Sequence, residues 1–165
     1  MNIDIIDLEK TCELFKSALN FVAHVAFQKG IILFITKDPA TIPIVERLAK
    51  ETGEYAQCRK WQSGTFTDSV KRFGTVIRFP DVVVFLNTND GFNEQHRAVR
   101  ECANMLIPTV AVVDTSNDPN LITYPIPGND DSIPAIELYC NLFKTVILTA
   151  KQKRADLDKQ NCVIE

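Results

Sequence analysis

Glycine is scarce in this chain, with six in 165 residues, and none of the six belongs to a phosphate-binding pattern. A Rossmann or P-loop nucleotide enzyme needs a glycine-rich turn between a strand and a helix, where backbone N–H groups and the helix dipole receive the phosphates. The first predicted strand leads instead into Thr36–Thr41, which contains Pro39 and no glycine. Because proline also removes a donor, the sequence argues against both kinds of nucleotide site.

Histidine and paired cysteines are also sparse. The chain has two histidines and five cysteines, and the cysteines show no C-x-x-C pair and no regular spacing. We therefore expect no zinc site and interpret the cysteines as buried thiols in a reducing compartment. His24 lies among apolar residues of a predicted helix, which favours a packing role, and His96 lies in the first turn of another. Neither accompanies a recognisable nucleophile motif, so no catalytic residue is predicted.

Long apolar runs are missing as well. A membrane helix needs about 20 apolar residues, whereas the longest runs here, Gly30–Ile35 and Pro80–Leu86, have the size of strands. The N-terminus has neither the pattern of a secretory signal nor that of an Arg-rich transit peptide. The composition, 45% apolar and 24% charged, is ordinary for a globular protein. We expect one α/β domain over residues 1–154 and a charged, frayed tail over 155–165, with no membrane partner.

What the chain does contain is alternating helical and strand patterns. Apolar residues recur at intervals of three and four, as in amphipathic helices, over 8–26, 42–49, 99–106 and 136–150. Continuous apolar runs predict buried strands at 31–35, 82–86 and 107–113, with a weaker candidate at 55–58 and a short helix near 67–73. Asp4 or Asp7 can cap the first helix, Asn93 is a plausible cap of the third, and Gly53 is expected to end the second. Tyr124–Pro127 resembles a rigid, proline-rich arm. This order favours a three-layer domain with a mostly parallel sheet and helices on both faces, flavodoxin-like or Rossmann-like.

Charge is distributed unevenly. The net charge is −3, yet residues 55–80 carry five cations against the single acid Asp68, which gives +4 there and −7 over the remaining 139 residues. Aromatic residues are interleaved with these cations: Tyr55, Trp61, Phe66, Phe73 and Phe79. Cations neutralise phosphates and flat rings stack on unpaired bases, so RNA is a sensible partner. The alternative is that Phe73 and Phe79 belong to the core and the cations are merely solvated.

Aspartates follow the predicted strand at 107–113. Asp114, Asp118, Asp130 and Asp131 offer hard oxygen ligands, which would suit a magnesium-dependent enzyme using Asp114 with Asp130 or Asp131. The competing interpretation is structural. Asp114 and Asp118 would close turns through side-chain to backbone bonds, while Asp130, Asp131 and Ser132 would satisfy the open N–H groups of the last helix.

Four ordered segments resemble the universal S-two family of small-subunit ribosomal proteins, in its bacterial and organellar branch. They are Ile3–Thr11, Trp61–Asp68, Pro80–Val84 and Ile122–Ser132. Ser63 and Asp68 replace a glycine and an asparagine of the family's tryptophan loop. Bacterial members insert a long helical hairpin after this loop, whereas only eleven residues, Ser69–Phe79, separate Asp68 from Pro80 here. That shortening is similar to the animal mitochondrial form.

The resemblance implies a structural, non-enzymatic protein of the mitochondrial small ribosomal subunit, located in the matrix. Its partners would be small-subunit rRNA and neighbouring ribosomal proteins, with no cofactor, metal or small-molecule substrate. The loop around Trp61 becomes the leading RNA contact, and the aspartates become residues that fix turns. The candidate RNA-binding residues are Arg59, Lys60, Trp61, Thr65, Lys71, Arg72 and Arg78.

Overall fold

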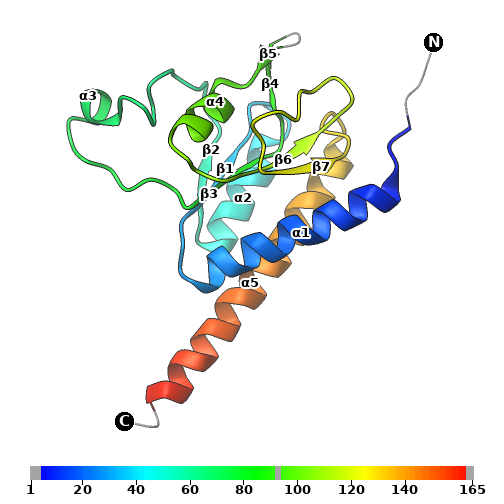
Figure 1. Ribbon diagram of the computed structural model, residues 1–165. Helices are drawn as coiled ribbons and strands as arrows, with labels where there is room; N and C mark the ends of the chain where they lie inside the picture. The colour runs from blue at the N-terminus through cyan, green and yellow to red at the C-terminus, as the bar shows by residue number, and fades with distance from the viewer. Residues whose placement is uncertain (1–4, 92–93, 163–165) are drawn as a thin grey trace.

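A five-stranded parallel sheet forms the centre of the computed structural model, which describes residues 5–91 and 94–162 (Figure 1). Its strands are β1 (Ile32–Ile35), β2 (Tyr55–Gln57), β3 (Val82–Phe85), β6 (Thr109–Val113) and β7 (Tyr124–Pro127). Their spatial order, β2-β1-β3-β6-β7, corresponds to the flavodoxin-like doubly wound order once the separate antiparallel pair β4 (Asn89–Gly91) and β5 (Glu94–Gln95) is set aside. The predicted fold class is confirmed.

The helices cover the two faces of the sheet unequally. They are α1 (Leu8–Phe27), α2 (Ile42–Thr52), α3 (Ser69–Phe73), α4 (Arg97–Asn104) and α5 (Ile133–Cys162). Alternate strand residues such as Phe34, Val84 and Val112 pack against α1, α2 and α5. The intervening residues, such as Ile35 and Phe85, pack against α4 and the loop that contains Trp61. Figure 1 shows α1, α2 and α5 gathered together, with α3 and α4 apart from them.

The helix boundaries follow local chemistry. Of the two expected candidates, Asp7 caps α1, because its Oδ1 accepts a hydrogen bond from the Glu9 N–H at 3.1 Å, while Asp4 lies outside the described residues. Gly53 ends α2 in the left-handed conformation at φ 70°, which glycine adopts without strain. The predicted cap Asn93 lies outside the described residues. His96 takes the cap position of α4, where its Nδ1 accepts a hydrogen bond from the Ala98 N–H at 3.2 Å.

Helix α5 corrects the expectation of a frayed tail after residue 154. It continues to Cys162, and Figure 1 shows its last turns extending away from the sheet. Asp158 binds both Lys29 of the α1–β1 turn, at 2.8 Å, and Arg154 one turn back, at 2.9 Å. These pairs supply partners for charges that the sequence pattern alone left to solvent.

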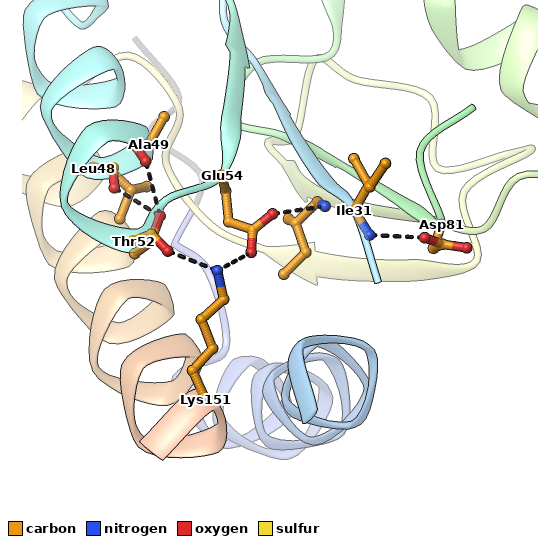
Figure 2. A network of polar contacts seen from close by, with 8 residues as sticks. Ile31, Leu48, Ala49, Thr52, Glu54, Asp81 and Lys151 are labelled. Carbon is orange, nitrogen blue, oxygen red and sulfur yellow. Dashed lines mark hydrogen bonds and ion pairs between the residues drawn. The ribbon is translucent and has the colours of Figure 1, made fainter. Parts of the chain in front are cut away.

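Lys151 connects α5 to the end of the sheet at which β1 begins (Figure 2). Its ammonium group donates to the Thr52 carbonyl at the end of α2, at 2.7 Å, and pairs with Glu54 at 2.5 Å. The Glu54 carboxylate, which is almost fully buried, also accepts from the Ile32 N–H at 3.0 Å. Asp81 accepts from the neighbouring Ile31 N–H at 2.7 Å. The two carboxylates therefore satisfy backbone donors where β1 begins.

Three further expectations are wrong. The proline-rich arm at Tyr124–Pro127 is the edge strand β7, which pairs in parallel with β6, and an edge is where proline is tolerated in a sheet. Leu106 was expected in the core but is 90% exposed, since the chain leaves α4 there with φ 56°. His24 is exposed rather than packed.

The four cysteines whose side chains the structure describes differ in burial, and the side chain of Cys162 lies outside that part. Cys102 and Cys140 are buried as expected, and burial raises the pKa of each thiol to about 12, so both stay protonated. Cys12, by contrast, is exposed. Cys58 is partly buried, and its pKa is raised to about 11 by the same cause. The prediction of buried thiols is therefore confirmed for Cys102 and Cys140, half right for Cys58 and wrong for Cys12.

Among the described helices, α5 alone has the length and apolar composition that a membrane-spanning helix needs, over Ile133–Gln160. About a third of its most apolar window is buried, and this part includes Ile136, Cys140, Phe143 and Ile147, which face the sheet and α1. Ile133, Leu138 and Leu148 are exposed, so the hydrophobic core accounts for only part of the composition of this helix.

Candidate nucleic-acid interface

The connection from β2 to β3, residues 58–81, contains the basic segment and lies over the α4 face of the sheet. Two of its aromatic rings point inward. Trp61 and Phe66 are 5% and 4% exposed and meet edge to face at a centroid distance of 5.0 Å. Phe79 packs on Phe66 at 6.0 Å, and His96 lies 6.1 Å from Trp61. The loop is therefore part of the second hydrophobic core.

A buried carboxylate on α4 holds this loop in place. Glu101 is 7% exposed, and its Oε1 accepts hydrogen bonds from the Trp61 indole N–H at 3.1 Å and the Gly64 N–H at 2.9 Å. Its Oε2 accepts from the Phe66 N–H at 2.9 Å. Three donors of the loop thus share one acceptor group, and hydrogen bonds to a charged group are the stronger kind.

Glu101 was not among the predicted site residues. The available signal was its position beside Cys102, which the periodicity placed on the inner face of its helix. A carboxylate so close to the core requires partners, but the sequence does not show which segment supplies them.

Two of the predicted RNA-binding residues, Trp61 and Thr65, form hydrogen bonds that hold the loop itself. Trp61 is buried with its N–H bonded to Glu101, so its ring is not available for stacking on a base. Thr65 is partly buried, and its hydroxyl donates to the Gln62 carbonyl at 2.6 Å within the turn. Burial of the indole in the core therefore argues against stacking of the Trp61 ring on a base.

The five predicted cations all lie at the surface but differ in their partners. Lys71 pairs with Asp68 at 3.7 Å and Arg78 with Asp81 at 3.4 Å. Arg59 and Lys60 are exposed and form no ion pair within the described part of the chain. Arg72 donates to the Ser63 carbonyl at 3.3 Å. Arg59, Lys60 and Arg72 are therefore cations without a carboxylate partner, whereas Lys71 and Arg78 are partly neutralised.

Two arginines of α4 extend the basic surface, and sequence reasoning missed both. Arg97 and Arg100 are exposed three residues apart, which places them on one side of the helix. Arg97 donates to the Ser63 hydroxyl at 3.4 Å, so α4 and α3 both reach the tryptophan loop through an arginine. The sequence does show two arginines near the start of a predicted helix. Their separation along the chain from residues 55–80 gave no reason to join them to the basic segment.

The aromatic residues of the segment also separate into two groups. Tyr55 is 59% exposed and Phe73 is 49% exposed, whereas Phe79 is partly buried against Phe66. The alternative of a purely structural role therefore holds for Phe79 and fails for Phe73. Rings available to a base are Tyr55 and Phe73 rather than Trp61.

The aspartates that follow β6 mostly stabilise turns. Asp114 accepts from the Thr115 N–H at 2.6 Å, and Asp118 accepts from the Asn120 N–H at 2.9 Å, which confirms their predicted role. The start of α5 differs from the expectation, because the Asn129 carboxamide oxygen accepts the N–H groups of Asp131 and Ser132, at 2.9 and 3.2 Å.

Asp114, Asp130 and Asp131 lie together, each offering one carboxylate oxygen within 4.8 Å of the others. Asp130 is buried and accepts a hydrogen bond from the Asn117 side chain at 2.9 Å. Burial raises the pKa of Asp130, and the neighbouring charges of Asp131 and Asp114 raise it further. The cluster could offer carboxylate oxygens as metal ligands. Two of its carboxylates already accept hydrogen bonds, Asp114 from a turn N–H and Asp130 from the Asn117 side chain.

Comparison with known proteins gives a consistent result. The family model described as Ribosomal protein S2 matches residues 1–75 and 69–150. The bovine small ribosomal subunit protein uS2m is 49% identical over 155 residues, which cover 94% of this chain and 53% of that protein. The chain thus spans about half the length of this relative.

Bacterial proteins are more distant. The small ribosomal subunit protein uS2 of Wolbachia pipientis is 33% identical over 188 residues, covering 88% of this chain and 65% of that protein. The uS2 of Idiomarina loihiensis is 28% identical over 202 residues, covering 99% and 84%. The model match over most of the chain, together with the bovine similarity, assigns the family: the chain belongs to the ribosomal protein S2 family.

Proposed function

We propose that this protein is a structural constituent of the small subunit of the mitochondrial ribosome, working in the matrix, where it binds rRNA and neighbouring ribosomal proteins and catalyses no reaction. The observation that carries the proposal is the 49% identity to bovine uS2m across nearly the whole chain. The parallel sheet supports it, since it has the flavodoxin-like order but no glycine-rich turn for a nucleotide after β1.

RNA is bound, on this proposal, by the surface of the β2–β3 connection. Arg59, Lys60 and Arg72 supply charge that carboxylates do not already neutralise, and Lys71 and Arg78 add to the surrounding potential. Trp61 and Thr65 act indirectly, by holding the loop on α4. A chain of net charge −3 leaves much of its remaining surface for protein partners.

The same connection supports the inference that a family insertion is missing. The family model matches in two segments that meet at residues 69–75, which is the position of α3. Between β2 and β3 the described chain forms only this five-residue helix. Both observations agree with a chain that lacks the hairpin expected of bacterial members.

Gradient sedimentation of a mitochondrial lysate tests the function. We expect the protein to co-sediment with the small subunit and to be released at high salt. Recovery only in ribosome-free fractions would contradict the proposal. RNA binding by the purified chain tests the surface, and Arg59→Ala with Lys60→Ala is expected to weaken it and to reduce the log–log salt slope by about 1.4–1.8.

A further inference from the structure

Two arginines from different helices meet at one serine of the tryptophan loop. Arg72 of α3 donates to the Ser63 carbonyl at 3.3 Å, and Arg97 of α4 donates to the Ser63 hydroxyl at 3.4 Å. Within residues 5–91 and 94–162, neither guanidinium forms an ion pair. Two like charges that approach one residue repel each other, and an anion placed between them would relieve the repulsion.

The start of α4 increases this positive potential. Arg97 is the first residue of the helix and Arg100 the fourth, and the first turn contains no acidic residue. The amino end of a helix carries a partial positive charge, so cations there are unfavourable for the isolated helix. The arrangement therefore reduces the stability of α4 slightly and favours an anionic ligand.

The α4 arginines lie on a helix that is packed against the second core. The inner side of α4 is buried in the second core through Ala98, Val99 and Cys102. Glu101, the residue after Arg100, holds the loop on both sides of Ser63 through its bonds to Trp61 and Gly64. Groups held in place before binding lose less entropy when the ligand arrives, which improves affinity.

We propose that Arg72, Arg97 and Arg100 form a phosphate clamp centred on Ser63 that grips the backbone of an RNA strand. The proposal rests on the ribosomal function and adds α4 to the RNA-binding surface. Guanidinium groups bind phosphate oxygens in a bidentate manner, and one phosphate can bridge two of them. Such contacts fix the position of the strand without reading its sequence.

The observations favour RNA over an acidic protein segment. Arg59 and Lys60 lie on the same connection and are likewise exposed and unpaired within the described residues, so the clamp belongs to a longer set of cations. Phe73, half-exposed at the end of α3, adds a ring on which a base can stack. A phosphate chain supplies both the repeated charge and the base, whereas an acidic peptide supplies only the charge.

The test compares matched double variants of the full chain. Arg97→Ala with Arg100→Ala removes the α4 half of the clamp, and Lys16→Ala with Lys50→Ala removes two exposed cations from α1 and α2. The probes are a small-subunit rRNA transcript and a uridine homopolymer, titrated over a range of salt. We expect the clamp variant to bind roughly tenfold or more weakly at low salt. Its log–log salt slope should fall by about 1.4–1.8 on both probes, with little change in the control.

A conservative variant separates charge from geometry. Arg97→Lys with Arg100→Lys is expected to keep the salt slope but to recover only part of the affinity, because lysine lacks the planar fork. Thermal unfolding of the alanine variant should be unchanged or slightly higher in midpoint, since the first turn of α4 loses unfavourable charges.

Three results would overturn the clamp. The first is wild-type binding by the α4 variant while Arg59→Ala with Lys60→Ala still binds weakly, which would leave the ribosomal function intact. The second is a lowered unfolding midpoint, which would show that the arginines are structural. The third is equal displacement of RNA by polyglutamate at matched charge, which would point to an acidic protein partner. Absence of RNA binding by the wild type would reject the RNA role in the proposed function as well.

Discussion

The carboxylates on the two faces of the sheet have different partners. On the face covered by α1, α2 and α5, three ion pairs join separate elements, Lys151 with Glu54, Lys144 with Glu51, and Lys29 with Asp158, while Lys16 and Lys50 are exposed and form no ion pair within the described residues. On the face covered by α4 and the β2–β3 connection, the buried carboxylate of Glu101 binds loop N–H groups and leaves the arginines around it unneutralised. Ion pairs thus connect elements of the first face, whereas on the second face the buried carboxylate positions a loop beside unpaired arginines.

The largest difference between the faces is expected from Phe143→Ala. Phe143 is fully buried in α5 and meets Phe15 and Phe34 edge to face, at 5.5 and 6.3 Å. Its removal should lower the free energy of unfolding by about 3–5 kcal/mol, through lost burial and an unfilled cavity. Urea denaturation measures the loss, with the partly exposed Leu148→Ala as control. The affinity of the remaining folded protein for RNA should stay the same, and a large change would contradict the separation of the faces.

Glu101→Ala should disturb the second face more selectively. It leaves the Trp61 indole N–H and the Phe66 N–H buried without an acceptor, so a loss of about 2–4 kcal/mol is expected. Trp61 is the only tryptophan, and its fluorescence should shift to the red as the loop loosens. RNA affinity should fall although no cation is removed.

Two variants sharpen the Glu101 result. Glu94→Ala removes an exposed carboxylate of β5 and controls for net charge. Glu101→Gln should be intermediate, because the amide keeps one acceptor oxygen but turns a donor toward one of the loop N–H groups. Unchanged fluorescence and affinity in Glu101→Ala would mean that the carboxylate does not position the loop.

The contrast between the faces also explains how far the sequence could be read. The continuous apolar runs at 82–86 and 107–113 predicted buried parallel strands, and the structure has β3 at Val82–Phe85 and β6 at Thr109–Val113. Local chemistry predicted a cap at Asp4 or Asp7, of which Asp7 is found, and the end of α2 at Gly53. These features depend on neighbours within a few residues, which a single sequence contains.

The errors concern partners distant in the chain. Trp61 was expected at the surface because its sequence neighbours are cations, but its acceptor is Glu101, forty residues away. Helix α5 continues to Cys162, and its Asp158 contacts Lys29, which lies 129 residues earlier in the chain. Arg97 joined the site only through its contact with Ser63. Such pairings are set by the tertiary fold, and periodicity carries no information about them.

A smaller effect on the second face is expected from acid through His96, whose ring lies beside those of Trp61 and Phe85. His96 is 3% exposed, and burial lowers its pKa below 6.5 in the folded protein. The unfolded chain therefore binds the proton first, so the contribution of neutral His96 is complete above pH 6.5 and decreases as the pH falls through its folded pKa. His96→Asn keeps a capping side chain and should flatten this part of the stability curve. An equally steep wild-type and variant curve between pH 6.5 and 5 would contradict the assignment.

The smallest effect is expected where charge on the second face is already neutralised. Asp68 and Lys71 form an exposed ion pair at 3.7 Å, and Asp68 makes no side-chain cap bond to α3. Removing both, with Asp68→Ala and Lys71→Ala, should change stability by less than about 1 kcal/mol, because exposed pairs contribute little. RNA affinity should also stay nearly constant, since the net charge is unaltered. Arg72→Ala, which removes the adjacent unneutralised cation, should weaken binding and lower the salt slope by about 0.7–0.9. Titrating both variants with one RNA makes the comparison direct, and an equal loss in the two would show that local neutralisation does not decide which cations of this face bind phosphate.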